Sequence, residues 1–174
     1  ILSDMGAKVI LEVPAPLKKL AKTLEGNIEL VDPGQKKLAF DMQCPIMSLP
    51  LACKTTLETV PNKVPYLFAE QEKVNNWNTK LGPKSRPRVG LAWSGARGQA
   101  NDHNRSMRLK ELAPLLNLPI ELHSLQKEVR DEDEAFLSES SIFDHRSSIQ
   151  DFSDTAALIH SMDFVISVDT GIAH

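Results

Sequence analysis

The stretch Asp163-Phe-Val-Ile-Ser-Val-Asp-Thr-Gly-Ile-Ala-His174 decides the expected fold of this chain. Its residues 164–168 form a short apolar, β-branched run, which is typical of a strand buried on both faces of a parallel sheet. A turn of small residues follows at once, and Ile172-Ala173 would begin a helix. Such a turn favours anions, because unpaired N–H groups and the helix dipole meet there. The candidate anion-binding residues are Asp169, Thr170, Gly171 and His174; the alternative is an ordinary capped turn.

The totals describe an ordinary globular chain. It has 174 residues, 41% of them hydrophobic and 25% charged, and a helix beginning at its last residue predicts a fragment of a larger domain. A net charge of −3 predicts no nucleic-acid partner, and no run approaches the roughly 18 apolar residues of a transmembrane segment. Cys44 and Cys53 make no disulfide framework, so we expect two reduced thiols in a cytoplasmic protein.

The first part of the chain predicts a parallel βαβ unit. Strands are expected at residues 7–13 and 28–31, around a helix at residues 17–24. A third strand is expected at residues 39–43, and the proline-rich residues 44–50 predict a loop.

A second α/β unit is expected after residues 82–87, the clearest boundary in the chain. The strands predicted for this part of the chain lie at 89–93, 120–125 and 164–168, with a minor strand at 142–143. Helices are predicted at 67–81, at 128–137, where the sequence is acidic, and at 155–161, where Asp154 is the cap. A further helix would be capped by Ser106 and interrupted at Pro114.

Two further strand ends carry polar residues suited to phosphate. Ser94 and Gly95 follow the strand at 89–93 and offer backbone N–H groups, and Arg105 ends the polar loop with a planar fork. Gln126 and Lys127 follow the next strand, where the first suits a base or ribose edge and the second a phosphate. The alternatives are a solvated loop and exposed polar residues that open a helix. Neither a P-loop nor a dinucleotide fingerprint is present.

No metal site is expected. Asp131-Glu-Asp-Glu134 is best explained as a solvated acidic first turn, which the helix dipole favours. The five histidines, His103, His123, His145, His160 and His174, lack metal-ligand spacing.

Several motifs in fixed order carry a family resemblance. They are Asp41-Met-Gln-Cys-Pro-Ile-Met-Ser-Leu-Pro50, Val89-Gly-Leu-Ala-Trp-Ser-Gly95, Asn104-Arg-Ser-Met107, Ser124-Leu-Gln-Lys127, Asp151-Phe-Ser-Asp-Thr-Ala-Ala157 and the stretch from Asp163 to His174. Together they resemble the glycosyltransferase domain at the carboxyl end of many bacterial tetratricopeptide-repeat proteins. That domain is related to the ADP-heptose:lipopolysaccharide heptosyltransferases and is distantly similar to O-GlcNAc transferase.

The resemblance implies a GT-B architecture of two incomplete Rossmann-like units with parallel sheets. Residues 1–66 would belong to the acceptor-side domain, residues 67–87 would form a helix and linker, and residues 88–174 would begin the donor domain. The implied reaction transfers a sugar from a nucleotide-diphosphate sugar to an unknown glycan, lipid or protein acceptor. It would need no metal or other cofactor, since helix N-termini and basic side chains stabilise the leaving diphosphate.

The resemblance also assigns roles. The turn Asp169, Thr170, Gly171 with His174 would surround the diphosphate or nucleoside, Ser94, Gly95 and Arg105 would approach the phosphates, and Gln126 the nucleoside. The catalytic acidic base of related enzymes would precede residue 7, so no catalytic residue is assigned and we expect the chain itself to be inactive. Gln43 stands where relatives carry His, which departs from the pattern.

Two other functions remain open from the sequence. One is a non-catalytic sugar-nucleotide-binding or scaffold module in a repeat protein, with tetratricopeptide repeats on its amino-terminal side. The other is a GT-B-like epimerase of nucleotide sugars, which would need paired acidic residues and a histidine in the cleft.

Overall fold

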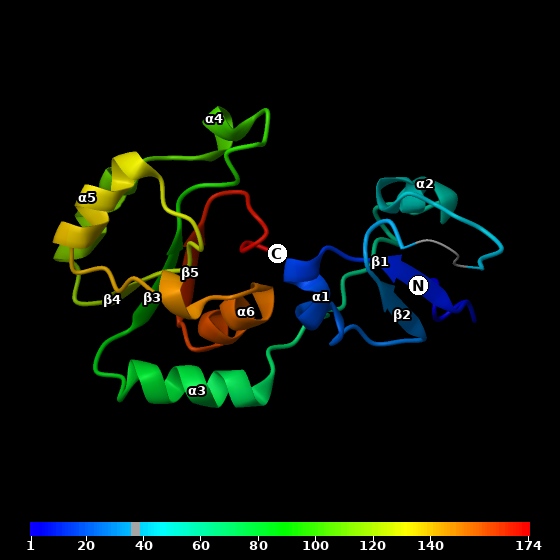
Figure 1. Cartoon of the computed structure of the whole chain (residues 1–174), viewed down its shortest axis with the longest axis horizontal. Helices are drawn as coiled ribbons and strands as arrows, with labels where there is room; N and C mark the ends of the chain where they lie inside the picture. Colours follow the sequence, from blue (N-terminus) through cyan, green and yellow to red (C-terminus); the bar gives the residue numbers. More distant parts are fainter. Residues whose placement is uncertain (36–38) are drawn as a thin grey trace. The chain divides into compact units, whose positions relative to one another are not determined.

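The computed structural model describes residues 1–35 and 39–174, and the chain forms two compact units, Ile1–Phe68 and Ala69–His174. Each unit contains parallel strands connected through helices (Figure 1). The predicted α/β class with parallel sheets is therefore confirmed. The helix expected at 67–81 begins only at Gln71 and lies wholly within the second unit.

The first unit is built on the expected βαβ arrangement. Strand β1 (Val9–Glu12) leads through helix α1 (Ala15–Ala21) to strand β2 (Ile28–Val31), and the two strands pair in parallel. A proline in the first turn of α1 costs little, because the first N–H groups of a helix have no partner within the helix. The small core consists of Val13, Leu20, Ala21 and Val31.

The strand expected at residues 39–43 is wrong. The segment has no regular structure, and the side chains of Phe40 and Met42 are 58% and 90% exposed. No described strand pairs with this segment, so its backbone groups lack the ladder that stabilises a strand. The turn η1 (Ile46–Ser48) and the short helix α2 (Leu49–Ala52) follow it.

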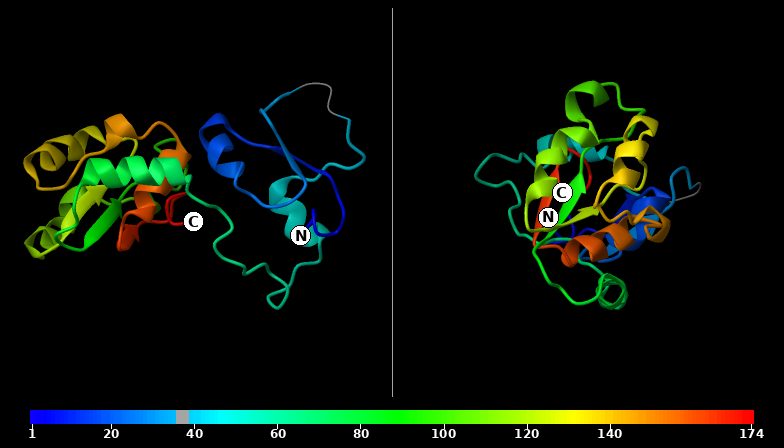
Figure 2. Two further views of the ribbon diagram at one scale, coloured as in Figure 1. Left: turned by 90° about the horizontal axis from the view of Figure 1, so that it is seen from below. Right: turned by 90° about the vertical axis from the view of Figure 1, so that its left-hand side faces the viewer.

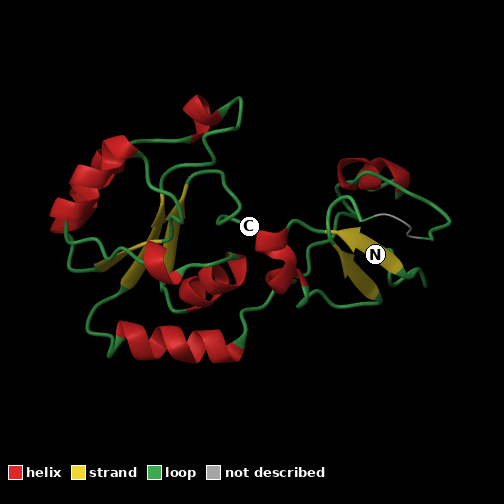
Figure 3. Ribbon diagram, viewed as in Figure 1, coloured by secondary structure: helices red, strands yellow, loops and turns green. Residues whose placement is uncertain are grey.

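The second unit is organised around a parallel sheet. Strand β3 (Arg88–Ala92) lies between β4 (Glu121–Ser124) and β5 (Phe164–Ser167), as Figures 2 and 3 show. Val89 of β3 aligns with Leu122 of β4 and with Phe164 of β5. Because all these strands run in the same direction, their carboxyl ends meet at one edge of the sheet.

Helices cover both faces of this sheet (Figure 1). On one face, η2 (Leu109–Asn117) and α5 (Asp131–Glu139) pack over Val89, Leu91 and Trp93. On the other face, α3 (Gln71–Leu81) and α6 (Phe152–His160) enclose a cluster made of Val74, Trp77, Leu125, Ile149, Ala157 and Leu158. Alternate residues of β3 therefore face different cores: Val89 and Leu91 belong to the first, whereas Gly90 lies against Leu125 of the second.

Several helix predictions need correction. The segment expected as an α-helix capped by Ser106 is a 3₁₀ helix that begins at Leu109 and contains Pro114, a residue that lacks the N–H an α-helix requires. Helix α6 is capped by Asp151, whose carboxylate accepts from the Ser153 N–H at 2.9 Å. Asp154, the predicted cap, completes the capping box from the third helical position.

The acidic first turn of α5 is also not uniformly solvated. Asp133 is 2% exposed, and its carboxylate accepts hydrogen bonds from Trp93 and from the Leu109 N–H. Burial of this charged group is possible because both oxygens have donors. The minor strand expected at 142–143 reduces to one bridge between His123 and Phe143, ahead of the turn η3 (Arg146–Ser148).

Strand β5 is correctly placed, but the expectation that it is buried on both faces is wrong. Phe164, Val165 and Ile166 are 66%, 38% and 41% exposed. β5 pairs only with β3 among the described strands, so its second edge and part of its faces lack cover. The helix expected at Ile172 is a turn in this structure.

Replacing Gly90 by alanine is expected to destabilise the second unit by about 1–3 kcal/mol through overpacking. An added Cβ would lie 2.7 Å from Cδ1 of Leu125, a side chain that is 1% exposed and packed in the second core. Gly98→Ala is the control, since nothing lies within 4 Å of the added atom. Urea unfolding measures both, and equal stability of the two variants would contradict the packing explanation.

Candidate functional site

The loops after β3 and β5 meet at Gly95. A Cβ added to Gly95 would lie 3.7 Å from the Thr170 methyl carbon and 3.4 Å from an Asp102 carboxylate oxygen. The parallel pairing of β3 and β5 produces this meeting, and the ladder extends to Val168, whose N–H donates to the Ala92 carbonyl at 2.9 Å. These are ordinary van der Waals distances for a Cβ, so they show that the two loops lie next to each other.

Arg105 joins the two loops. It lies at the end of the short helix α4 (Asp102–Arg105), and its guanidinium donates to the Asp169 carbonyl from Nε at 3.0 Å and also from Nη2. Its Nε lies 3.5 Å from the Asp169 carboxylate as well. The side chain is 26% exposed, so a cation accessible to solvent stands beside the turn that follows β5.

A second basic group, Arg130, is linked to Gly95 through the Ser106 hydroxyl. The Ser106 hydroxyl accepts from the Gly95 N–H at 2.9 Å and donates to the Asp102 carboxylate at 2.6 Å. Arg130 Nη2 donates to the same hydroxyl at 2.9 Å and to Asp102 at 2.5 Å. The hydrogen bond from Ser106 lowers the pKa of Asp102 most, burial opposes it, and Arg130 lowers it further. Asp102 is therefore a carboxylate at neutral pH.

Ser94 and Gln126 are buried next to this loop and form hydrogen bonds with each other. Both are 6% exposed. The Gln126 amide donates to the Ser94 hydroxyl at 2.9 Å and to the Glu128 carbonyl at 3.1 Å, and it accepts from the Ser94 N–H at 3.4 Å. These hydrogen bonds link the ends of β3 and β4, so in this structure the Gln126 amide has its partners within the chain.

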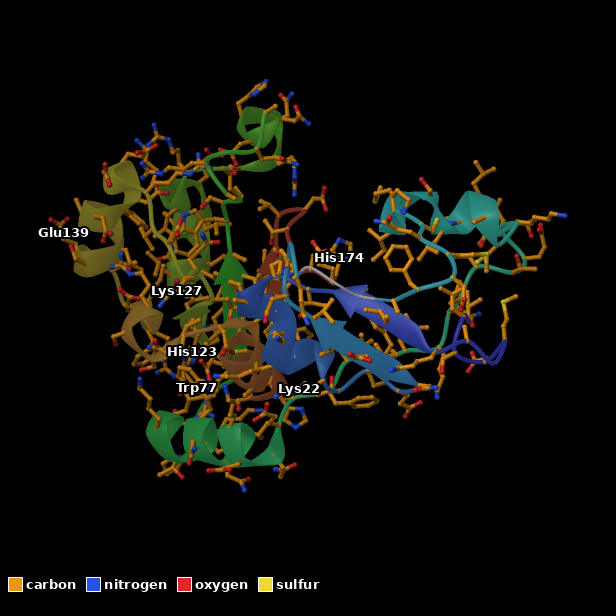
Figure 4. The ribbon with its side chains drawn as sticks, turned by 45° about the vertical axis from the view of Figure 1, so that its right-hand side comes forward. Lys22, Trp77, His123, Lys127, Glu139 and His174 are labelled. Carbon is orange, nitrogen blue, oxygen red and sulfur yellow. The ribbon has the colours of Figure 1, made fainter. Side chains whose placement is uncertain are left out.

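The other predicted residues lie in three different surroundings (Figure 4 labels Lys127 and His174). Lys127 donates to the Ile149 carbonyl and, at 3.4 Å, to the Arg146 carbonyl. Gly171 lies against the Phe152 ring, 3.4 Å from where its Cβ would be. His174 is 72% exposed, with Nε2 3.8 Å from an Asp169 oxygen. The structure thus brings together Gly95, Arg105, Asp169 and Thr170, with His174 beside them, and places Lys127 apart.

Sequence reasoning missed Asp102, Ser106 as a hydroxyl donor, and Arg130. Asp102 and Ser106 lie in the polar loop already singled out, so their residue types gave a usable signal. Arg130 gave none, because it is 24 residues from Ser106 and falls within a segment expected as an acidic helix.

No protein-family model, curated protein or solved structure matches this chain. Within residues 1–35 and 39–174, no group of three or more His, Cys, Asp or Glu side chains is placed to hold a metal ion. Over the same residues, none of the helices combines the length and apolar character that crossing a bilayer requires.

Proposed function

We propose that this chain is part of a GT-B glycosyltransferase-like domain and that its second unit binds a nucleotide-diphosphate sugar. The observation that carries the proposal is the meeting of Gly95, Arg105 and Thr170 at the carboxyl ends of β3 and β5. Ligands of open parallel sheets bind at this edge. The ordered motifs of the sequence resemble a family with this donor class.

The chemistry of the site suits a diphosphate. Nε and Nη2 of Arg105 donate to the Asp169 carbonyl, and the planar guanidinium also carries the N–H groups of Nη1, which suit phosphate oxygens better than a lysine would. The small turn at Thr170 and Gly171 adds backbone N–H groups and a hydroxyl. In a transfer reaction, these groups would stabilise the negative charge that develops on the leaving diphosphate, which is the largest electrostatic demand of that step.

Arg105→Ala is expected to weaken binding of the nucleotide-diphosphate sugar at least tenfold, since charge-assisted hydrogen bonds contribute about 1.5–3 kcal/mol. A thermal-shift panel of UDP, ADP, GDP and CMP sugars identifies the donor, because ligand at about 100 times Kd adds about 2.7 kcal/mol to the stability. Titration of the variant with that sugar then gives the loss.

Arg86→Ala is the matched control, because Arg86 is exposed in the segment before β3. It removes the same charge and should leave the affinity within about twofold. If no nucleotide sugar shifts the melting temperature of the folded chain, the proposed function fails. If a longer protein that includes the upstream acidic base binds the nucleotide sugar but transfers no sugar, the non-catalytic module is favoured.

A further inference from the structure

The carboxylate of Asp102 is held as a bound oxyanion would be held. One oxygen accepts from the Ser106 hydroxyl at 2.6 Å, and the other accepts from Arg130 Nη2 at 2.5 Å. The first oxygen also lies 3.4 Å from the Cβ position of Gly95, directly against the turn that follows β3. An anion of the chain itself therefore lies in van der Waals range of the Gly95 turn, held by Ser106 and Arg130.

We propose that Arg130, Ser106 and the Gly95 turn form a phosphoryl subsite that Asp102 occupies in this structure and leaves when a phosphoryl group binds. The proposal rests on the proposed function. It adds two phosphoryl-binding residues, Arg130 and Ser106, and a regulatory carboxylate, that of Asp102. A phosphoryl oxygen would take over the hydrogen bonds of the carboxylate from Ser106 and Arg130. Asp102 acts on affinity only, because it competes with the ligand for the same donors.

Arg130 retains capacity for such a ligand. Its Nε–H is buried and has no hydrogen-bond acceptor among the described residues, although its Nη2 makes two bonds. The Asp102 carboxylate accepts from Nη2 and leaves Nε without an acceptor, whereas a phosphoryl group with three oxygens could accept from both Nε and Nη2. A buried donor without an acceptor costs free energy, so a ligand that pairs it gains that amount.

Asp102 also lies where displacement is inexpensive. Helix α4 spans only Asp102–Arg105 and contains no buried residue. It belongs to a polar loop that runs from the end of β3 to Met107, whose N–H donates to the Trp93 carbonyl at 2.9 Å. Segments with few buried apolar contacts open at low free-energy cost, so the loop can move while the sheet remains intact.

The test is calorimetric titration of inorganic pyrophosphate into the whole chain, comparing Asp102→Asn with Asp131→Asn. Both variants remove one negative charge, and Asp131 is a 95% exposed neighbour that pairs with Arg97 at 3.5 Å. We expect Asp102→Asn to tighten pyrophosphate binding at least tenfold and Asp131→Asn to change it less than twofold. Adding Arg130→Met to Asp102→Asn should abolish the gain. Equal affinities of the two single variants would overturn the proposal.

A measurement on the unmodified chain does not depend on the folding of any variant. The ¹⁵N resonance of the Arg130 Nε–H should move when pyrophosphate is added, and a resonance that stays fixed at saturation overturns the subsite. The two proposals can fail separately. If pyrophosphate binds as expected and no nucleotide sugar binds, the proposed function fails and the phosphoryl subsite stands. If nucleotide sugars bind through Arg105 and Asp102→Asn has no effect, the phosphoryl subsite fails and the proposed function stands.

Discussion

Replacing Asp133 by alanine is expected to lower the free energy of unfolding of the second unit by about 3–5 kcal/mol. The carboxylate accepts from Trp93 Nε1 at 2.9 Å and from the Leu109 N–H at 3.0 Å. Both donors lie in the core between the sheet and α5, where Trp93 and Leu109 are 0% exposed. Alanine leaves both donors without an acceptor and without access to water, and each such group costs about 1–3 kcal/mol.

Asp131→Ala is the control within the same helical turn. Its side chain is 95% exposed, so its removal should change stability by no more than about 0.5 kcal/mol. Urea unfolding followed by tryptophan fluorescence measures both variants, and near-ultraviolet circular dichroism reports the packing of Trp93. A loss for Asp133→Ala as small as that for Asp131→Ala would show that the two hydrogen bonds contribute little to stability.

The case of Asp133 shows what a local pattern misses. Four consecutive acidic residues predict a solvated helix start, and the helix is there, but its rotation puts Asp133 alone toward Trp93. That pairing spans 40 residues of sequence, and no local pattern contains it. The β1–α1–β2 unit and strands β3, β4 and β5 were predictable because each carries its own apolar signal.

Two strand predictions were wrong in whole or in part because the segments lack neighbouring structure to pack or pair with. Residues 39–43 have strand-forming composition but no described partner, and β5 has the apolar run of a buried strand without the cover. For the candidate site, the strand-end rule brought Gly95, Arg105 and Thr170 into one place correctly. It could not indicate that Gln126 bonds inward to Ser94, because that depends on side-chain geometry.

Lowering the pH from 6.5 to 4 is expected to remove about 3 kcal/mol or more of stability through a buried histidine pair. Nδ1 of His123 lies 3.0 Å from Nε2 of His145, and their rings stack with centroids 5.3 Å apart. His123 is 2% exposed and His145 is 6% exposed. Burial, the largest cause, lowers the pKa of each imidazole from 6.5 to about 4.

The neighbouring charges act in both directions. Arg88 lowers the pKa of His123 further, whereas Glu121, 3.8 Å from its Nε2, raises it. For His145, the charges of His123 and Lys80 lower the pKa, and Asp144 raises it. For both histidines burial outweighs the nearby carboxylate, so the pKa lies at about 4.

The sign of the pH effect follows from these values. Above pH 6.5 the imidazoles are neutral in both the folded and the unfolded chain, so stability does not depend on them. As the pH falls from 6.5 to 4, only the unfolded chain takes up the protons, and each site costs about 1.4 kcal/mol per pH unit. Below pH 4 both states are protonated and the loss is complete.

The test is the slope of unfolding free energy between pH 6 and 5, a range above the ordinary pKa values of Asp and Glu. His123→Phe keeps an aromatic ring between Phe143 and His145 but removes one titrating group, so it should roughly halve the slope. His160→Gln replaces an exposed histidine and should leave the slope unchanged. If His123→Phe and the unmodified chain lose stability equally over this range, the pair does not cause the pH dependence. The expected loss arises because a protonated imidazole would be buried beside a second imidazole and the Trp77 ring, whose centroid lies 5.1 Å from that of His145.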